Sequence, residues 1–172
     1  LQVFNSPASL IFLNLFFILG TGLIIYLIGY SLGSKWLGAA ASLFYLLDPT
    51  TIFNSLFALS DLAFVFLFLL AVYLLWFKNT VSLTSTFFNS LLLATSILIR
   101  PIAIFAAPVV IIGYLILQRD FWRGRLLPIA ALFLVSFSII LGPWLWRNGE
   151  LTGHYSLSSL TGYNLLFYNA AQ

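Results

Sequence analysis

Charged side chains are scarcer in this chain than a water-soluble fold allows. Its 172 residues include only seven Lys and Arg and four Asp and Glu, and 62% of them are hydrophobic. Soluble domains carry roughly 25% charged residues, because their surfaces must be covered by groups that water solvates. The composition therefore excludes a soluble globule. It also excludes an intrinsically disordered chain, which requires low hydrophobicity and high net charge.

The charges and turn residues divide the apolar sequence into six candidate membrane helices. About 20 apolar residues cross a bilayer, and shorter segments suffice where a helix is tilted or partly buried. The expected helices are 8–30, 36–47, 61–77, 81–99, 102–117 and 126–146, with a polar stretch at 50–60 and a charged loop at 118–125. We therefore predict an all-α, polytopic transmembrane bundle over residues 1–147, followed by a polar extracytoplasmic segment over 148–172.

The cations are distributed unevenly if these helices alternate across the membrane. Only Arg100 and Arg147 fall on one side, and short loops rich in Lys and Arg stay in the cytoplasm. The side with five cations is thus predicted to be cytoplasmic, which places Asp48, Asp61 and Glu150 outside. The five cations are Lys35, Lys78, Arg119, Arg123 and Arg125. No Lys/Arg run of the kind that binds nucleic acid is present, so nucleic acid is not expected as a partner.

Asp61 follows Ser60 at the start of the third expected helix. An acid there is stabilised by the helix dipole and by free N–H groups, so either residue serves as a cap. Ionisable groups in membrane helices are functional by default, so the alternative is a carboxylate that faces an outer cavity as a base, a metal ligand or an acceptor-positioning group. Asp48, next to Pro49, is interpreted as a structural turn residue.

Two arginines are expected at the outer headgroup level. Arg100 follows nineteen uncharged residues. It therefore requires a lipid headgroup, a carboxylate or a phosphate as its partner, unless it snorkels to the interface. Arg147 follows Trp144 and Trp146, which mark the membrane interface. Guanidinium groups bind phosphate through paired hydrogen bonds, so the two arginines suit a lipid-linked phosphate.

The tail offers a weak metal pair and no other catalytic signature. Glu150 and His154 are four residues apart, but Gly149 and Gly153 interrupt the stretch, so His154 is interpreted as an exposed loop residue. No P-loop, GxSxG, HExxH or GxGxxG pattern occurs, which gives no support to nucleotide hydrolysis or to soluble hydrolase chemistry.

Short polar motifs lie between and within the apolar segments along the chain. They are Asp48-Pro49, Asn54-Ser55, Ser60-Asp61, Ile99-Arg100-Pro101, Pro143-Trp144-Leu145-Trp146-Arg147-Asn148, Gly153, Gly162-Tyr163-Asn164-Leu165 and Asn169. This series resembles the multi-spanning glycosyltransferases of the GT-C fold, and more narrowly the bacterial group of protein mannosyltransferases and aminoarabinose transferases. The resemblance covers essentially the whole chain, and its most specific part is the last helix and tail.

The resemblance implies an inverting glycosyltransferase of a bacterial or archaeal inner membrane, with its active face outside the cytoplasm. The sugar would come from a polyprenyl-phosphate carrier and pass to a glycan, lipid or protein acceptor. In the family, the general base lies in the first outer loop. The first helix here matches a later family helix, and the sequence begins without methionine. The base is therefore expected before Leu1, and the piece alone is expected to be inactive.

The resemblance also implies roles for individual residues. Asp61 matches a position where the family more often has Glu, which suits a second acidic group near the acceptor or a metal. Arg100 matches the Arg-Pro position and is assigned to the phosphate. Arg147 and Asn148 are likewise assigned to phosphate binding. Tyr163 and Asn164 are assigned to the wall of the outer cavity. No cofactor is predicted, and a divalent metal is left open.

Two other functions are compatible with the same residues. A transporter or flippase of lipid-linked or small polar substrates also uses broken helices and intramembrane charges, but it predicts internal repeats that this sequence does not show. A non-catalytic membrane subunit is the third interpretation. The glycosyltransferase hypothesis predicts that Asp61, Arg100 and Arg147 converge on one outer cavity.

Overall fold

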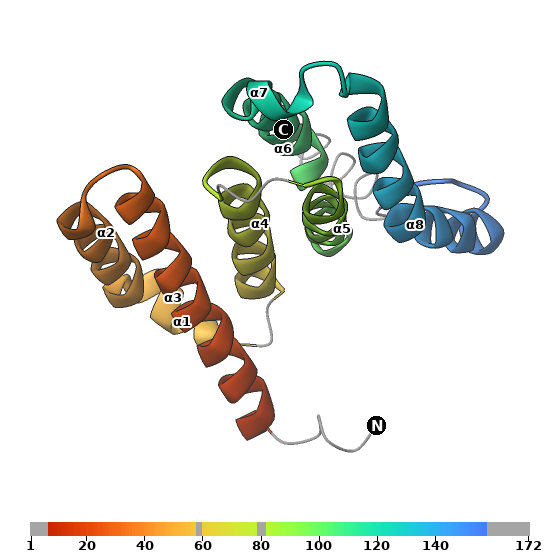
Figure 1. The fold of residues 1–172 in the computed structure, drawn as a ribbon. Coiled ribbons are helices and arrows are strands. Elements are labelled where there is room, and N and C mark those ends of the chain that lie inside the picture. Colours follow the sequence, from red (N-terminus) through yellow and green to blue (C-terminus); the bar gives the residue numbers. More distant parts are fainter. Residues whose placement is uncertain (1–6, 58–59, 79–81, 158–172) are drawn as a thin grey trace, which may run out of the picture.

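The computed structural model describes residues 7–57, 60–78 and 82–157, and within these ranges the chain forms helices and no strand (Figure 1). This confirms the all-α prediction. Two helices, over Ile11–Ser31 and Leu126–Thr152, are long and apolar enough to cross a membrane. The elements are α1 (Pro7–Ser31), α2 (Lys35–Leu47), α3 (Pro49–Ser55), α4 (Asp61–Trp76), α5 (Leu83–Ile99), α6 (Ala103–Leu117), α7 (Arg119–Trp122) and α8 (Leu126–Thr152).

The apolar surface of the long helices faces outward rather than into a core. Only 28% of the apolar window in α1 and 22% of that in α8 is buried. On α1 the side chains of Phe12, Phe16, Leu19 and Leu23 are all more than half exposed. They recur at helical spacing and form one apolar stripe. An exposed stripe of this kind favours contact with lipid over contact with water.

A pair of glycines allows α1 and α2 to pack as a tight hairpin. A Cβ atom on Gly29 would overlap the backbone of Gly38, so the two helix backbones cross at these positions. The connecting turn uses Gly33, whose φ of 95° lies in the left-handed region that favours glycine. Ser34 then caps α2 by accepting a hydrogen bond from the Leu37 N–H at 3.1 Å.

The stretch 50–60, interpreted as polar, overlaps the short helix α3, which begins at Pro49. Asp48 ends α2 and begins α3, because its carboxylate accepts hydrogen bonds from the Thr51 N–H at 2.7 Å and the Thr51 hydroxyl at 2.9 Å. Pro49 occupies the first turn, where its missing N–H costs nothing. The interpretation of Asp48 as a structural turn residue is therefore confirmed, in the specific form of a helix cap.

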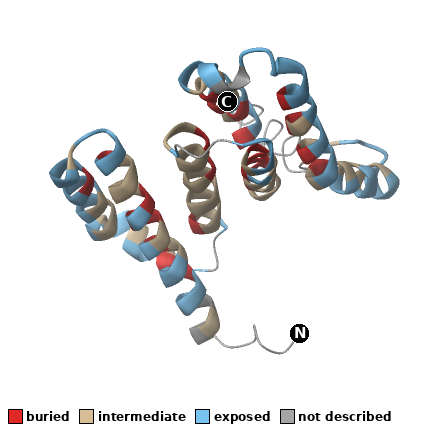
Figure 2. Ribbon diagram, in the orientation of Figure 1, coloured by how far each residue is buried: buried red, intermediate tan, exposed pale blue. Residues whose placement is uncertain are grey.

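The core lies where α4, α5, α6 and α8 meet, and Figure 2 shows their buried residues on the sides that face one another. Small side chains such as Ala71 and Ala107 let the helices approach, and Tyr114 is the largest fully buried residue. The Trp76 indole N–H donates to the Val110 carbonyl oxygen at 2.8 Å and so links α4 to α6. This core fixes the positions of the helix ends that carry the charges.

The last helix is longer than predicted and changes direction along its length (Figure 1). Pro143 lies inside α8 and removes one backbone donor, which accounts for a bend there. The predicted end at Trp146 is wrong, because α8 continues to Thr152, so the expected division at 147/148 falls within the helix. Gly149 does not interrupt it. The helix ends at Gly153, which has a φ of 72° and donates its N–H to the Gly149 carbonyl oxygen at 2.9 Å.

Candidate functional site

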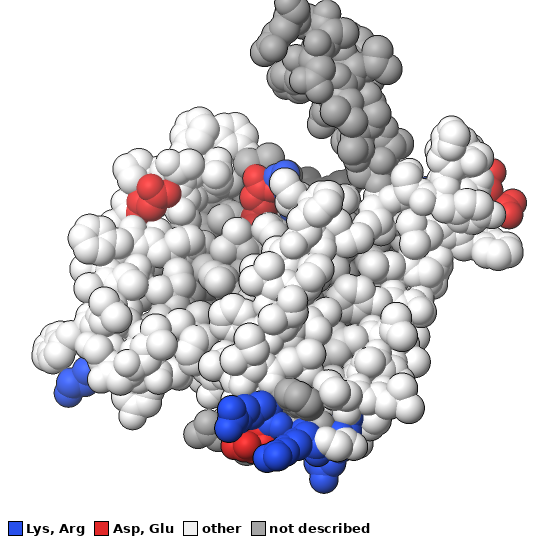
Figure 3. Space-filling model, turned by 90° about the horizontal axis from the view of Figure 1, so that it is seen from above, with Lys and Arg blue, Asp and Glu red and all other residues white. Residues whose placement is uncertain are grey.

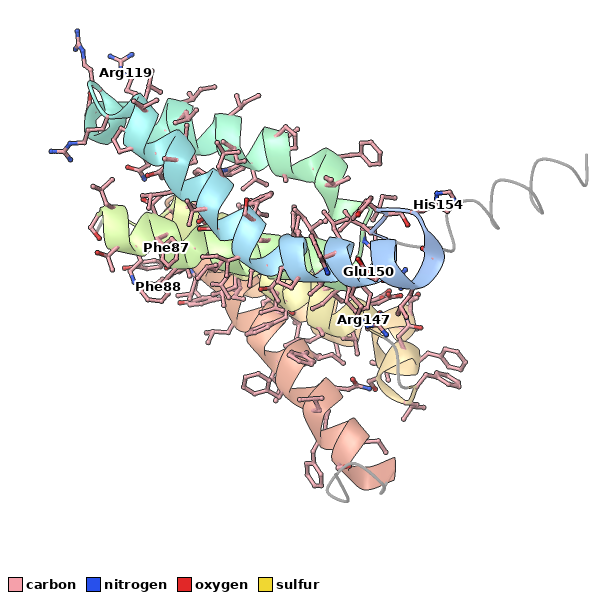
Figure 4. All side chains as sticks on the ribbon, turned by 90° about the vertical axis from the view of Figure 1, so that its right-hand side faces the viewer. Phe87, Phe88, Arg119, Arg147, Glu150 and His154 are labelled. Atoms are coloured by element: carbon pink, nitrogen blue, oxygen red, sulfur yellow. The ribbon has the colours of Figure 1, made fainter. Side chains whose placement is uncertain are left out.

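The charges of the described residues gather at two opposite edges of the molecule (Figure 3). Most cations lie along one edge, around a single acid, and the other acids lie along the opposite edge, one of them beside a cation. Figure 4 shows Arg119 at one end of the helices and Arg147, Glu150 and His154 at the other. The arrangement follows from the helix order, because consecutive helices return the chain to alternate ends.

Asp61 and Arg100 form an ion pair at the end of the molecule where α4 begins and α5 ends. Asp61 Oδ1 contacts Arg100 Nη2, and the side chains are 39% and 43% exposed, respectively. Oδ1 itself is out of solvent. The pair is therefore neither buried in the core nor fully exposed. It joins the first turn of α4 to the break between α5 and α6.

The break between α5 and α6 aims Arg100 at α4. Arg100 has extended backbone geometry, with φ −132° and ψ 100°, and its N–H still donates to the Ser96 carbonyl oxygen at 3.0 Å. Pro101 disfavours a helical conformation in the residue before it, which explains the break. The Ala103 N–H then donates to the Arg100 carbonyl oxygen at 2.9 Å and starts the turn into α6.

These contacts bear on two alternatives left open by the sequence. Ser60 is not a side-chain cap of α4, because it makes no such hydrogen bond. Asp61 stands in the first turn, where the helix dipole favours an acid, and its carboxylate engages Arg100. Of the partners considered for Arg100, the structure contains the carboxylate. Sequence reasoning identified both residues but did not pair them.

Arg147 and Asn148 belong to a second polar group, on the part of α8 that follows the bend. The Arg147 guanidinium lies over the Trp144 ring, 5.2 Å from its centroid, and Nη1 approaches Asn148 Oδ1 at 3.5 Å. Among the described residues, no hydrogen bond or ion pair joins Arg147 to Asp61 or Arg100. Of the three residues expected to converge on one outer cavity, Asp61 and Arg100 are in direct contact, whereas Arg147 contacts Trp144 and Asn148.

The segment after α8 folds back along the helix. The Asn148 amide donates to the Ser156 carbonyl oxygen at 2.8 Å, and the Trp144 indole N–H donates to the Leu157 carbonyl oxygen at 3.1 Å. The Tyr155 ring packs against Gly149, where a Cβ atom would collide with it. These contacts order the C-terminal end of α8, and no local sequence pattern predicts the individual partners. Tyr163 and Asn164 lie outside the described residues.

Asn14 is a polar residue that the sequence analysis passed over. It is buried in α1, and its amide donates to the carbonyl oxygens of Ser55 at 2.8 Å and Phe57 at 2.9 Å. These bonds hold the end of α3, just before the connection to Asp61. A lone Asn in a helix without charges was the available signal, because such a residue requires partners when it is buried in apolar surroundings.

The described part of the tail brings no metal-binding group together. Glu150 lies within α8 and His154 follows it, both exposed. Within the part of the chain that the structure describes, no group of three or more His, Cys, Asp or Glu could hold a metal ion. The interpretation of His154 as an exposed loop residue is confirmed.

Three comparisons, with models of protein families, with curated proteins and with solved structures, found no match to this chain.

Proposed function

We propose that the chain is part of a multi-pass membrane glycosyltransferase that transfers a sugar from a polyprenyl-phosphate donor to an acceptor on the extracytoplasmic side. The observation that carries the proposal is the Asp61–Arg100 ion pair, which joins the start of α4 to the end of α5. The motif series in the sequence, which resembles GT-C glycosyltransferases, assigns the same residues to this chemistry.

The donor phosphate is proposed to bind to Arg147, Asn148 and Arg100. Arg147 is exposed and held over Trp144, so its position is restricted while its guanidinium stays accessible. Arg100 contacts Asp61 through Nη2, and a guanidinium has five N–H donors in a planar fork. Arg100 can therefore bridge the carboxylate and a phosphate. Such donors stabilise the charge that develops on the leaving phosphate.

Transfer proceeds as a single displacement with inversion at the anomeric carbon. The acceptor hydroxyl oxygen forms the new bond to that carbon, and the bond from carbon to the phosphate oxygen breaks. The electron pair of the broken bond leaves with the polyprenyl phosphate, and the acceptor proton goes to a carboxylate base. Asp61 is assigned to orienting the acceptor rather than to taking the proton, because Arg100 already occupies its carboxylate.

The test is a transfer assay in membranes that contain the whole protein, with polyprenyl-phosphate mannose and polyprenyl-phosphate aminoarabinose as donors. Arg147→Ala should reduce transfer at least tenfold, since a lost charged hydrogen bond to a leaving group costs about 1.5–3 kcal/mol. Lys35→Ala removes a cation from α2, away from the proposed site, and should leave transfer unchanged. Wild-type turnover in Arg147→Ala would contradict the assignment. Movement of the donor across the bilayer without transfer would identify a transporter instead.

A further inference from the structure

The loop between α6 and α8 carries a concentrated positive charge that the proposed reaction does not use. Arg119, Arg123 and Arg125 lie in this loop. The end of α4 lies beside it, because the Gln118 amide reaches the Trp76 carbonyl oxygen at 3.5 Å. Lys78, two residues after Trp76, therefore adds a fourth cation. We call this group, with the neighbouring Asp120, the basic patch; four cations and one acid give it a net charge of +3.

The local backbone keeps the arginines of the basic patch on the surface. The Arg123 N–H donates to the Arg119 carbonyl oxygen at 3.1 Å, which closes the single turn of α7. Gly124 has a φ of 79° and redirects the chain into α8. Arg119, Arg123 and Arg125 are all exposed. The loop thus presents guanidinium groups along the whole connection rather than directing them into the core.

Asp120 does not neutralise the basic patch. Arg119 Nε lies 3.9 Å from Asp120 Oδ1, and the two side chains are 78% and 95% exposed. That separation is too long for a hydrogen bond, and exposed ion pairs of this kind contribute little. The donors of Arg119 therefore remain accessible to a stronger anion, and arginine binds phosphate through two parallel hydrogen bonds.

Exposed apolar side chains border the basic patch directly. Leu117 ends α6 and Leu126 begins α8, and both are at least half exposed. Ile116 and Leu127 are 66% and 83% exposed. A ligand that fits this surface therefore combines a negative head with a hydrocarbon body. A free anion, a nucleic acid or an acidic protein would match the charges and leave the apolar border uncovered.

We infer that the basic patch binds the headgroup of an anionic glycerophospholipid. The phosphodiester contacts Arg119 and Arg123, and the acyl chains lie along Leu117 and Leu127. Anionic lipids attract basic segments next to membrane helices, and each Lys or Arg near the surface strengthens the binding by a factor of about five. The inference rests on the membrane association of the long apolar helices and is independent of the proposed transfer reaction.

The experiment is native mass spectrometry of the purified whole protein with equal amounts of phosphatidylglycerol and phosphatidylcholine of the same acyl chains. Wild-type protein should retain phosphatidylglycerol preferentially. Arg123→Gln should weaken that binding about fivefold, and Arg119→Gln combined with Arg123→Gln about 30-fold, with phosphatidylcholine binding unchanged. Lys35→Gln removes the same single charge from α2 and should change neither. Because both arginines are exposed, the variants should melt at the wild-type temperature.

Two results would overturn the inference. One is equal retention of phosphatidylglycerol by the wild type and by the double variant, with both folded. The other is complete displacement of phosphatidylglycerol by millimolar inorganic phosphate, which would show that the basic patch recognises the phosphate group without the lipid.

Discussion

Asp61, the first residue of α4, forms an ion pair with Arg100, the residue that ends α5. The pair connects two helix ends that are far apart in the sequence, at a level where both side chains are partly exposed. The pair joins the first turn of α4 to the α5–α6 break and holds a carboxylate beside a cation.

Exchange of the two charges should separate attraction between them from their other interactions. Asp61→Arg alone and Arg100→Asp alone each place like charges together and should lower the free energy of unfolding. The combined exchange should recover most of the loss. Because both groups are more than a third exposed, we expect a coupling of about 1 kcal/mol or less. Thermal unfolding of the four proteins in detergent gives this value, and purely additive losses would show that the charges do not interact.

The contact between Gly29 and Gly38 predicts a position that tolerates no side chain. Gly29→Ala puts a methyl group into the backbone of Gly38 and should cost about 1–3 kcal/mol, the usual penalty of overpacking. Gly142→Ala is the matched control, because no atom lies within 4 Å of its added Cβ. It should be neutral or stabilising by up to about 1 kcal/mol, since alanine favours helix. Equal unfolding temperatures for the two variants would argue against the tight crossing of α1 and α2.

The lengths of the apolar segments, and the charged and turn residues that bound them, predicted the main helices well. The segment expected at 61–77 begins at the same residue as α4 and ends one residue later, because Asp61, Lys78 and Asn79 mark its limits. Hydrophobicity was a poorer guide where a helix carries polar residues. The segment after Asp48 shows a helix start in its sequence, an acid followed by Pro49, but it was interpreted only as a polar stretch and no helix was predicted there.

The candidate site was predictable as a set of residues but not as a set of contacts. Asp61 and Arg100 each stood out because a charge in an apolar segment requires a partner. Their pairing depends on the packing of α4 against α5, which no local pattern encodes. The end of α8 was mispredicted for a related reason, since Gly149 leaves room for the Tyr155 ring that packs on the helix there.

Tyr114 provides a test of the polar contacts inside the core. Its hydroxyl lies 2.9 Å from Thr86 Oγ1, and Thr86 donates its own proton to the Ser82 carbonyl oxygen at 2.8 Å, so Tyr114 is the donor. Tyr114→Phe removes this hydrogen bond and keeps the ring, and should cost about 0.5–1.5 kcal/mol of unfolding free energy. Tyr114→Ala also opens a cavity and should cost about 3–5 kcal/mol. Chemical unfolding should show a smaller loss of unfolding free energy for Tyr114→Phe than for Tyr114→Ala. A Tyr114→Phe variant as stable as the wild type would show that the hydrogen bond contributes nothing.

Gly153 controls where α8 stops and hence where the returning segment lies. Its φ of 72° is accessible to glycine and tolerated by asparagine, whereas alanine pays about 1–2 kcal/mol there. Gly153→Ala should loosen the bonds from Trp144 to Leu157 and from Asn148 to Ser156, because they depend on the reversal of the chain. The measurement is amide hydrogen exchange over 153–157, which should accelerate in Gly153→Ala and stay close to wild type in Gly153→Asn. If both variants exchange at the wild-type rate, the turn at Gly153 does not hold this segment against α8, and the order of the surface around Arg147 must have another cause.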